Sequence, residues 1–245
     1  MRKKFNYLLH RCIDFLMYPH LIAVRSSGAV ADTYHKLNVP WFHSLKIDTV
    51  LDIGANIGRF AKTARYLCPN ARIVSFEPLP DCAEKTMQLM KGDGNFDLHN
   101  VGLGREPGSF SMKRSAHNPS SSFLPMTKIH KEAFPFTAET SEVSVEVKTL
   151  DSVAEELSLG DCIFIKVDVQ GFEKEVLLGG MKTFAKAKLL LLELSYEELY
   201  SNQPLFNDIY QLVVGLGFTF HGTVSTMPHP TTGAFLDSDC VFLKN

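Results

Sequence analysis

Residues 49–60 constrain the fold of this chain more than any other stretch, because they join a largely apolar run directly to a glycine-bracketed turn. The run Val50–Ile53 predicts a buried strand, and apolar residues at helical spacing from Phe60 onward predict a helix. Gly54 and Gly58 enclose the turn between the two. At such a junction the free N–H groups of the first helical turn point at a ligand, and glycine lets the backbone approach that ligand closely.

The spacing of the glycines indicates which class of ligand the turn serves. A dinucleotide site needs Gly-x-Gly-x-x-Gly, and a phosphate loop ends in Gly-Lys-Ser or Gly-Lys-Thr. Here Asn56 stands two residues after Gly54, and Arg59 follows Gly58, so neither phosphate signature is met. The turn therefore predicts either a site for a nucleoside without a pyrophosphate or a tightly packed corner, and a second motif is needed to decide.

Four acidic residues supply that second motif, because each lies at the end of a predicted core strand. They are Asp52, Glu77, Asp168 and Glu193. The carboxyl ends of parallel strands meet at one edge of a sheet, so these side chains are expected to line one pocket. Glu77 follows Gly54 by 23 residues, which is the separation at which an acid after the second strand meets ribose hydroxyls.

From residue 49 onward, predicted strands and helices alternate in the order of a parallel α/β sheet. The predicted strands cover residues 49–53, 72–76, 95–101, 162–167 and 189–192, followed by a closing antiparallel pair at 218–221 and 239–243. Residues 108–147 interrupt this order and predict an inserted antiparallel and loop segment, with strands at 109–113 and 143–147. We therefore expect one α/β domain over residues 47–245, with substrate choice made in the insertion.

The first 46 residues predict a helical extension of basic character. Apolar residues from Phe5 to Met17 recur at helical spacing, and a second helix is expected over 29–37. The extension holds seven lysine or arginine residues against two aspartates. The first helix is expected to pack on its own domain or on a second copy of the chain, with peripheral contact to an anionic membrane as the alternative. The charge also raises the hypothesis of an anionic acceptor.

Composition narrows the remaining function classes. The formal net charge of −2 disfavours a dedicated nucleic-acid partner. The five cysteines are odd in number and contain no Cys-x-x-Cys pair, so we expect reduced thiols, no thiolate metal site and a cytoplasmic location. Hydrophobic residues make up 45% of the chain, enough for a sizeable core, but their longest run is too short to span a membrane.

Two groups of motifs resemble known methyltransferases. Asp52-x-Gly54-x-Asn56-x-Gly58 resembles the first motif of the S-adenosylmethionine-dependent methyltransferases. The wider set resembles the FkbM family of methyltransferases and comprises residues 50–60, 76–78, 100–104, 120–122, 149–152 and 165–177. One departure from the family is Gln170, where Glu is usual.

The resemblance implies a Rossmann-like class I methyltransferase fold, with a seven-stranded, mostly parallel sheet and helices on both faces. It also implies transfer of a methyl group from S-adenosylmethionine to a hydroxyl of a sugar, glycan or secondary metabolite. Two other functions remain open on the residues themselves. One is a non-catalytic Rossmann-like nucleoside-binding module, and the other is an NAD-dependent oxidoreductase, which Asn56 disfavours because that fingerprint has glycine at this position.

Site residues follow from the motifs and the strand ends. Asp168 is the expected catalytic base, with Glu193 as second candidate. The expected cofactor-binding residues are Asp52, Gly54, Asn56, Gly58, Glu77, Asn100, Val101 and Asp168. The expected substrate contacts are Gln170, Ser121 and Ser122. No metal is expected, although a divalent ion held by Asp168 and Glu193 remains a minority alternative. Glu173 is open between a functional and a structural role.

Overall fold

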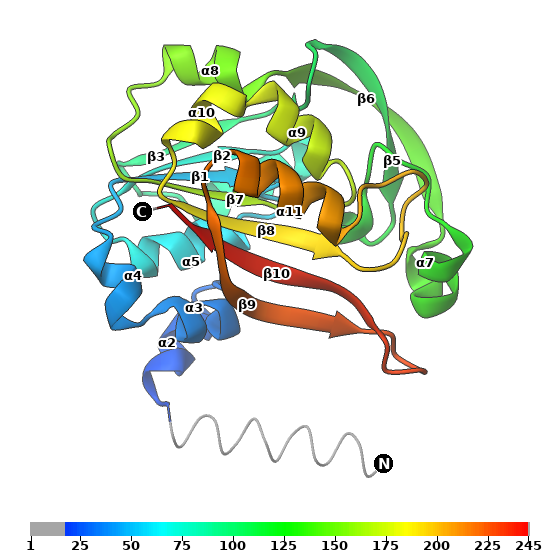
Figure 1. Cartoon of the computed structure of the whole chain (residues 1–245), viewed down its shortest axis with the longest axis horizontal. Coiled ribbons are helices and arrows are strands. Elements are labelled where there is room, and N and C mark those ends of the chain that lie inside the picture. The colour runs from blue at the N-terminus through cyan, green and yellow to red at the C-terminus, as the bar shows by residue number, and fades with distance from the viewer. Residues whose placement is uncertain (1–17, 245) are drawn as a thin grey trace.

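A seven-stranded sheet forms the centre of the molecule in the computed structural model, which describes residues 18–244 (Figure 1). The strand order is β3-β2-β1-β7-β8-β10-β9. The strands are β1 (Thr49–Ile53), β2 (Arg72–Phe76), β3 (Phe96–His99), β7 (Ile163–Val167), β8 (Leu189–Ser195), β9 (Thr219–Pro228) and β10 (Phe235–Leu243). Only β10 runs against its neighbours, β8 and β9. The predicted fold class and closing antiparallel pair are confirmed.

Helices cover both faces of the sheet, as Figure 1 shows. On one face lie α8 (Leu150–Glu156), α9 (Glu173–Gly179), α10 (Met181–Lys186) and α11 (Phe206–Gly215). The other face is covered by α3 (Ala31–Leu37), α4 (Pro40–Ser44) and α5 (Arg59–Leu67), while α6 (Pro80–Leu89) packs beside α5 and β3. Alternate residues of each strand therefore enter one of two hydrophobic clusters.

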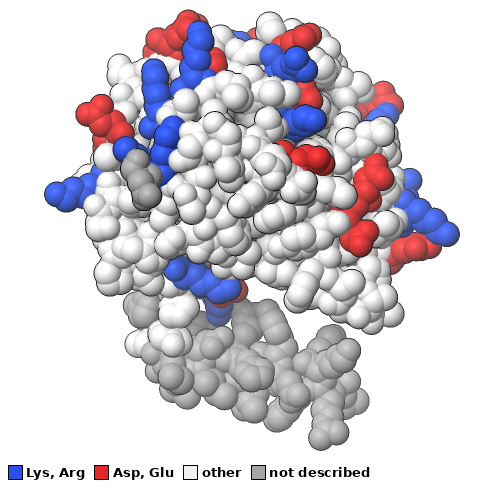
Figure 2. All heavy atoms as spheres, in the orientation of Figure 1, with Lys and Arg blue, Asp and Glu red and all other residues white. Residues whose placement is uncertain are grey.

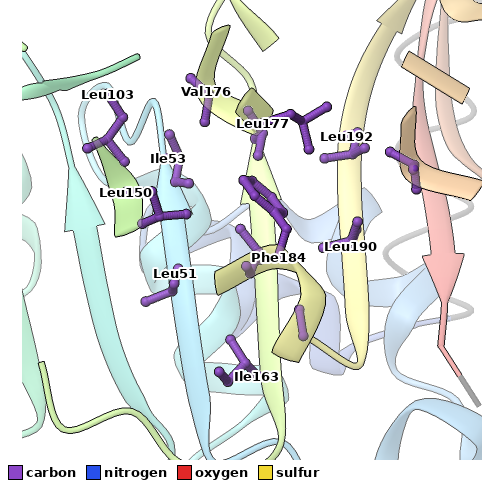
Figure 3. Close-up of a cluster of buried hydrophobic side chains, with 14 of the residues drawn as sticks. Leu51, Ile53, Leu103, Leu150, Ile163, Val176, Leu177, Phe184, Leu190 and Leu192 are labelled. Atoms are coloured by element: carbon purple, nitrogen blue, oxygen red, sulfur yellow. The ribbon is translucent and has the colours of Figure 1, made fainter. Parts of the chain in front are cut away.

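The larger cluster lies between the sheet and α8–α11 (Figure 3). Phe184 of α10 projects toward the sheet and packs with Ile53 of β1 and Leu190 and Leu192 of β8 in the same buried group. On the opposite face, Phe164 contacts the rings of both Phe42 and Phe60, with centroid distances of 5.8 and 5.7 Å. Burial of these apolar side chains on both sides fixes the register of the central strands.

The register brings the strand ends together at one edge. Ile53 of β1 pairs with Phe76 of β2 and with Val167 of β7, and Val167 pairs with Leu192 of β8. The next residue in each chain segment is Gly54, Glu77, Asp168 or Glu193. Parallel pairing alone thus aligns the glycine turn with three of the four predicted acids.

A second sheet lies at the side of the first and is formed by the two strands of the insertion and the short strand that precedes it. It contains β4 (Gly102–Leu103), β5 (Gly108–Ser115) and β6 (Thr140–Lys148), in the order β4-β6-β5. The predicted antiparallel pair is confirmed, because β5 and β6 pair over their whole length. The expected strand over 95–101 was too long: β3 ends at His99, and the chain then joins the second sheet at Gly102.

Between β5 and β6 the insertion continues as two 3₁₀ turns and a short helix. These are η1 (Asn118–Ser120), α7 (Lys128–Ala133) and η2 (Pro135–Thr137). They lie beside the β8 end of the sheet, where Thr127 N–H donates to the carbonyl of Leu199 at 2.9 Å. The insertion thus reaches across the carboxyl edge of the main sheet.

The described part of the N-terminal segment consists of α2 (His20–Ser26), α3 and α4. The predicted second helix is present as α3, while 40–44 is a short helix that begins with proline rather than an irregular lead into β1. Val30 N–H donates to Thr63 Oγ1 at 2.8 Å, which ties this segment to α5. The predicted helix over 5–17 lies outside the described residues. Within residues 18–244, no helix has the length and apolarity to cross a membrane.

Gly54 provides a test of the strand-to-helix turn. Its φ is +77°, and a Cβ there would lie 1.9 Å from the carbonyl oxygen of Asp168. We predict that Gly54→Ala lowers the free energy of unfolding by about 3 kcal/mol or more, because left-handed strain and overpacking add. Urea denaturation measures this. Gly92→Ala is the control, since Gly92 has φ +86° but open space around it, and should lose only about 1–2 kcal/mol. Equal losses in both variants would contradict the close approach.

Candidate active site

A cavity of about 440 Å³ opens at the carboxyl edge of the main sheet. It brings together eight of the sequence-predicted site residues: Gly54, Asn56, Glu77, Val101, Ser121, Asp168, Gln170 and Glu193. The turn after β1, the loops after β2 and β7, and β8 itself, which holds Glu193, provide most of these, as the strand register requires. The acids thus share one cleft, which is the arrangement that ligand binding needs.

Glu77 is held by the backbone of two loops. Its Oε2 accepts the N–H of Asn56 at 2.7 Å, and its Oε1 accepts the N–H of Leu79 at 2.9 Å. Burial raises the pKa of this carboxyl to about 7, although the two N–H donors act in the opposite direction. Each oxygen retains a second lone pair. Glu77 therefore fixes the glycine turn against the loop after β2 and can still accept hydrogen bonds from a ligand.

Lys166 lies at the centre of the site and was not singled out by sequence reasoning. Its Nζ is 3.4 Å from Asp52 Oδ1 and 3.5 Å from Asp168 Oδ2, and it donates to the carbonyl of Gly54 at 2.9 Å. Burial by itself lowers the pKa of this ammonium, but the charges of Asp168 and Asp52 raise it above its ordinary value. The signal in the sequence was a lysine inside an otherwise apolar strand.

Gln170 joins the two predicted catalytic carboxylates. Its Nε2 donates to Asp168 Oδ1 at 2.9 Å and to Glu193 Oε2 at 2.6 Å, and its Oε1 accepts the hydroxyl of Tyr200 at 2.8 Å. Burial raises the pKa of Glu193 well above its usual range, and the charges of Asp168, Asp237 and Asp239 add to this effect. A glutamate carboxylate at position 170 would have no N–H group to donate to Asp168 and Glu193. The glutamine that stands here in place of the family's usual Glu therefore makes two hydrogen bonds that a carboxylate could not make.

Four predicted site residues do not line the cavity. Asp52 is 0% exposed and lies beneath the floor against Lys166. Gly58 precedes α5, where a Cβ would lie 2.8 Å from Thr86 Cγ2. These two residues pack behind the residues that line the cavity.

The side chains of the other two, Asn100 and Ser122, bond to loop carbonyls and do not line the cavity. The Asn100 side chain, expected near the adenine, instead donates to the carbonyl of Glu77 at 2.7 Å and to that of Pro78 at 3.1 Å. Ser122 Oγ donates to the Gln170 carbonyl at 2.6 Å rather than lining the cavity. Both side chains brace loops because loop carbonyls at a strand end need donors, a requirement that motif spacing does not reveal.

The donor set is rich in carboxylates without the geometry of a metal centre. Among residues 18–244, no group of three or more His, Cys, Asp or Glu side chains is arranged to hold a metal ion. On the molecular face drawn in Figure 2, acidic and basic side chains are interspersed rather than gathered into an extended basic surface.

The sequence matches the methyltransferase FkbM domain family over residues 52–220, which is more than half of the chain. The chain belongs to the FkbM methyltransferase family. It is therefore a methyltransferase, and the predicted enzyme class is confirmed. The match includes the end of β1 and the whole of β2, β7, β8 and the insertion, and the ends of these four strands form the cavity.

Individual relatives agree with this assignment. The 2-O-methyltransferase NoeI of Sinorhizobium fredii is 29% identical over 170 residues, covering 67% of this chain and 70% of its own. Methyltransferase 1 of Beauveria bassiana is 33% identical over 143 residues, covering 53% of this chain and 57% of its own. A solved FkbM methyltransferase from Methylobacillus flagellatus has a TM-score of 0.51 at 15% identity, over 86% of this chain and 49% of that one, and shows the shared fold.

The buried charge on Lys166 gives a stability prediction for this methyltransferase. Lys166→Met leaves Asp52 buried without its cation, so the free energy of unfolding should fall by about 3–5 kcal/mol. Adding Asp52→Asn should restore part of this loss. Urea denaturation measures both. The control is Lys148→Met, which removes an exposed ion pair with Glu146 and should change stability by less than about 1 kcal/mol. A loss at Lys166 no larger than at Lys148 would contradict the central ion pair.

Glu173 gives a pH prediction. It is 4% exposed, its Oε1 accepts the N–H groups of Val169 and Gly171, and burial raises its pKa to about 7. The folded protein binds this proton more tightly than the unfolded chain, so stability falls as pH rises from about 4.5 to about 7.

Glu173→Gln keeps the acceptor oxygen but does not ionise. The loss of unfolding free energy between pH 5 and pH 8 should therefore shrink by up to about 3 kcal/mol relative to the unchanged protein. Glu155→Gln, at an exposed position of α8, is the control and should leave the pH dependence unaltered. If the unfolding free energy of Glu173→Gln depended on pH as steeply as that of the wild type, the raised pKa of Glu173 would be contradicted.

Proposed function

We propose that this methyltransferase uses S-adenosylmethionine to methylate a hydroxyl oxygen of a small molecule or glycan. The observation that carries the proposal is the pair Asp168 and Glu193, joined by one amide at the edge of the cavity that the glycine turn borders. The name of the relative NoeI, a 2-O-methyltransferase, supports oxygen as the acceptor atom. A carboxylate beside the acceptor suits a hydroxyl nucleophile, because its oxygen can accept the proton that the hydroxyl loses.

The inner cavity has the chemistry that a sulfonium nucleoside needs. Glu77 and Val101 both line the cavity. We assign the carboxylate lone pairs of Glu77 to the ribose hydroxyls and the backbone N–H of Val101 to a ring nitrogen of the adenine. Gly54 and Asn56 provide the close backbone of the turn. The carboxylates of Asp168 and Glu193 match the positive charge of the cofactor. When bound, the cofactor supplies an electrophilic methyl group.

The chain's own residues then orient the acceptor and take its proton. Asp168 follows β7 directly, and its side chain is 35% exposed, so we assign it the first contact with the acceptor hydroxyl. As the hydroxyl oxygen takes the methyl group and the sulfur–methyl bond breaks, the hydroxyl proton passes to a carboxylate oxygen of Asp168 or Glu193. Positioning contributes about 7–11 kcal/mol where orientation is good, and base catalysis adds about 10²–10⁴-fold.

The variants Asp168→Asn and Glu193→Gln test whether these two carboxylates remove the hydroxyl proton. Each should lower the yield of labelled product by about 10²-fold or more when the protein is incubated with deuterated-methyl S-adenosylmethionine and cell extract, because the pair loses its base. Calorimetry with S-adenosylhomocysteine should give unchanged affinity for Glu193→Gln. Weaker binding confined to Asp168→Asn would assign that residue to the cofactor.

Two outcomes bear on the proposal as a whole. Wild-type turnover in both variants would contradict a carboxylate base. Tight cofactor binding with no S-adenosylhomocysteine produced from any extract would favour the non-catalytic binding module. Glu155→Gln serves as the unaffected control, because it lies on α8, away from the cavity-lining residues.

We also propose a reducing, cytoplasmic location and a contact role for the N-terminal segment. Cys68, Cys82, Cys162 and Cys240 are free thiols, which fits a reducing compartment. The segment before residue 47 is proposed to mediate a homodimer or peripheral membrane contact. Analytical ultracentrifugation and vesicle co-sedimentation of the full chain distinguish the two.

A further inference from the structure

The outer wall of the cavity is built by residues 117–137 of the insertion, and no lysine, arginine, aspartate or glutamate of this range lines the cavity. The members that line it are aromatic, apolar or polar, including His117, Ser121, Phe123, His130, Phe134 and Phe136. The charged residues of α7, such as Lys128 and Glu132, do not line the cavity and are exposed. The wall therefore has the composition of a site for an apolar ring face rather than for an ion.

This wall is held firmly against the catalytic loops. Tyr200, which donates to Gln170, also donates its hydroxyl hydrogen to the carbonyl of Ser120 at 3.2 Å, so the two acceptors share one donor. Ser122 Oγ donates to the Gln170 carbonyl at 2.6 Å. Met126 pairs with Tyr200 in an isolated β-bridge. The same residues that position the carboxylates thus position the wall, as a preorganised binding site requires.

His130 is the unusual member of this wall. It is 3% exposed and lines the cavity, yet neither ring nitrogen has a hydrogen-bond partner among residues 18–244. Its ring packs against Tyr200 and Phe134, with centroid distances of 4.9 and 5.6 Å. Burial lowers its pKa to about 4, so the imidazole is neutral at pH 7. A buried polar group without a partner is costly, and a ligand that supplies the partner recovers that cost.

The inner part of the cavity disfavours an anionic acceptor. Glu77, Asp168, Glu193 and Asp239 all line it, while Lys166 already lies between Asp52 and Asp168. A further negative charge 4 Å from one of these carboxylates would cost several kcal/mol at an effective dielectric constant of about 20. The other cation lining the cavity, Arg59, donates to the carbonyl of Gly28 on the N-terminal side and not to the 117–137 wall.

We propose that residues 117–137 form the acceptor subsite, and that it takes a neutral cyclic alcohol whose second polar group hydrogen-bonds the imidazole of His130. The inference rests on the proposed O-methylation and names its substrate class. The ring face of the acceptor packs on Phe134 and Phe136, while its reacting hydroxyl reaches Asp168. This differs from the anionic acceptor that the basic N-terminal segment suggested.

Fractionation of labelled products tests the charge of the acceptor. The purified full chain is incubated with deuterated-methyl S-adenosylmethionine and an extract of the source cells from which its gene has been deleted. Products are then separated by anion exchange and detected by mass spectrometry. Label in the unretained fraction supports the subsite. Label mainly on the anion exchanger would leave O-methylation intact and overturn the subsite, whereas no label in any fraction would overturn the proposed function and the inference with it.

The variant His130→Phe tests the hydrogen bond. Phenylalanine keeps the ring contacts with Tyr200 and Phe134 but removes both nitrogens. We expect kcat/KM for the unretained acceptor to fall about tenfold or more, with unchanged S-adenosylhomocysteine affinity and no loss in thermal midpoint. His99→Phe is the matched control, because His99 also packs on a ring, that of Phe76 at 5.2 Å, but does not line the cavity. Wild-type kcat/KM in His130→Phe would overturn the assignment.

Discussion

The ion pair between Lys166 and Asp52 underlies the rest of this structure. Both residues belong to central strands, and both are almost completely buried, so neither charge is tolerable without the other. The same ammonium contacts Asp168 and the Gly54 carbonyl, which places the proposed base and the glycine turn against one buried charge. The floor of the site is thus part of the central sheet rather than of the loops that border the cavity.

Strand patterning predicted the alternating α/β order and the closing antiparallel pair, while the family resemblance implied the seven-stranded sheet. The same patterning placed Gly54, Glu77 and Asp168 at one edge, since each follows a strand directly, and Glu193 lies at the same edge although β8 continues past it. Motif position did not predict the partner of the Asn100 side chain. An amide beside a strand end can bond either a ligand or a loop carbonyl, and here it donates to the carbonyl of Glu77. The insertion's strand pairing was also predictable, because alternation and turn residues act locally.

Lys166 and His130 show what sequence reasoning missed and why. A lysine within an apolar strand signals a buried ion pair, but its partners come from β1 and from the residue two positions on, and only the sheet register joins them. His130 lies on a short helix whose sequence is ordinary. Its importance arises from burial and from nitrogens left unpaired by the surrounding fold, neither of which has a local sequence signal. Long-range packing therefore determined both.

The central claim is that acids from separate strands converge on one cavity to bind a sulfonium nucleoside beside the Asp168 and Glu193 pair. A crystal structure of the full chain with S-adenosylhomocysteine tests it most directly. The account predicts ribose hydroxyls within hydrogen-bond distance of Glu77, adenine against Val101, and the sulfur facing Asp168 and the 117–137 wall. A nucleoside bound elsewhere, or bound with its ribose away from Glu77 and its sulfur away from Asp168, would contradict the account.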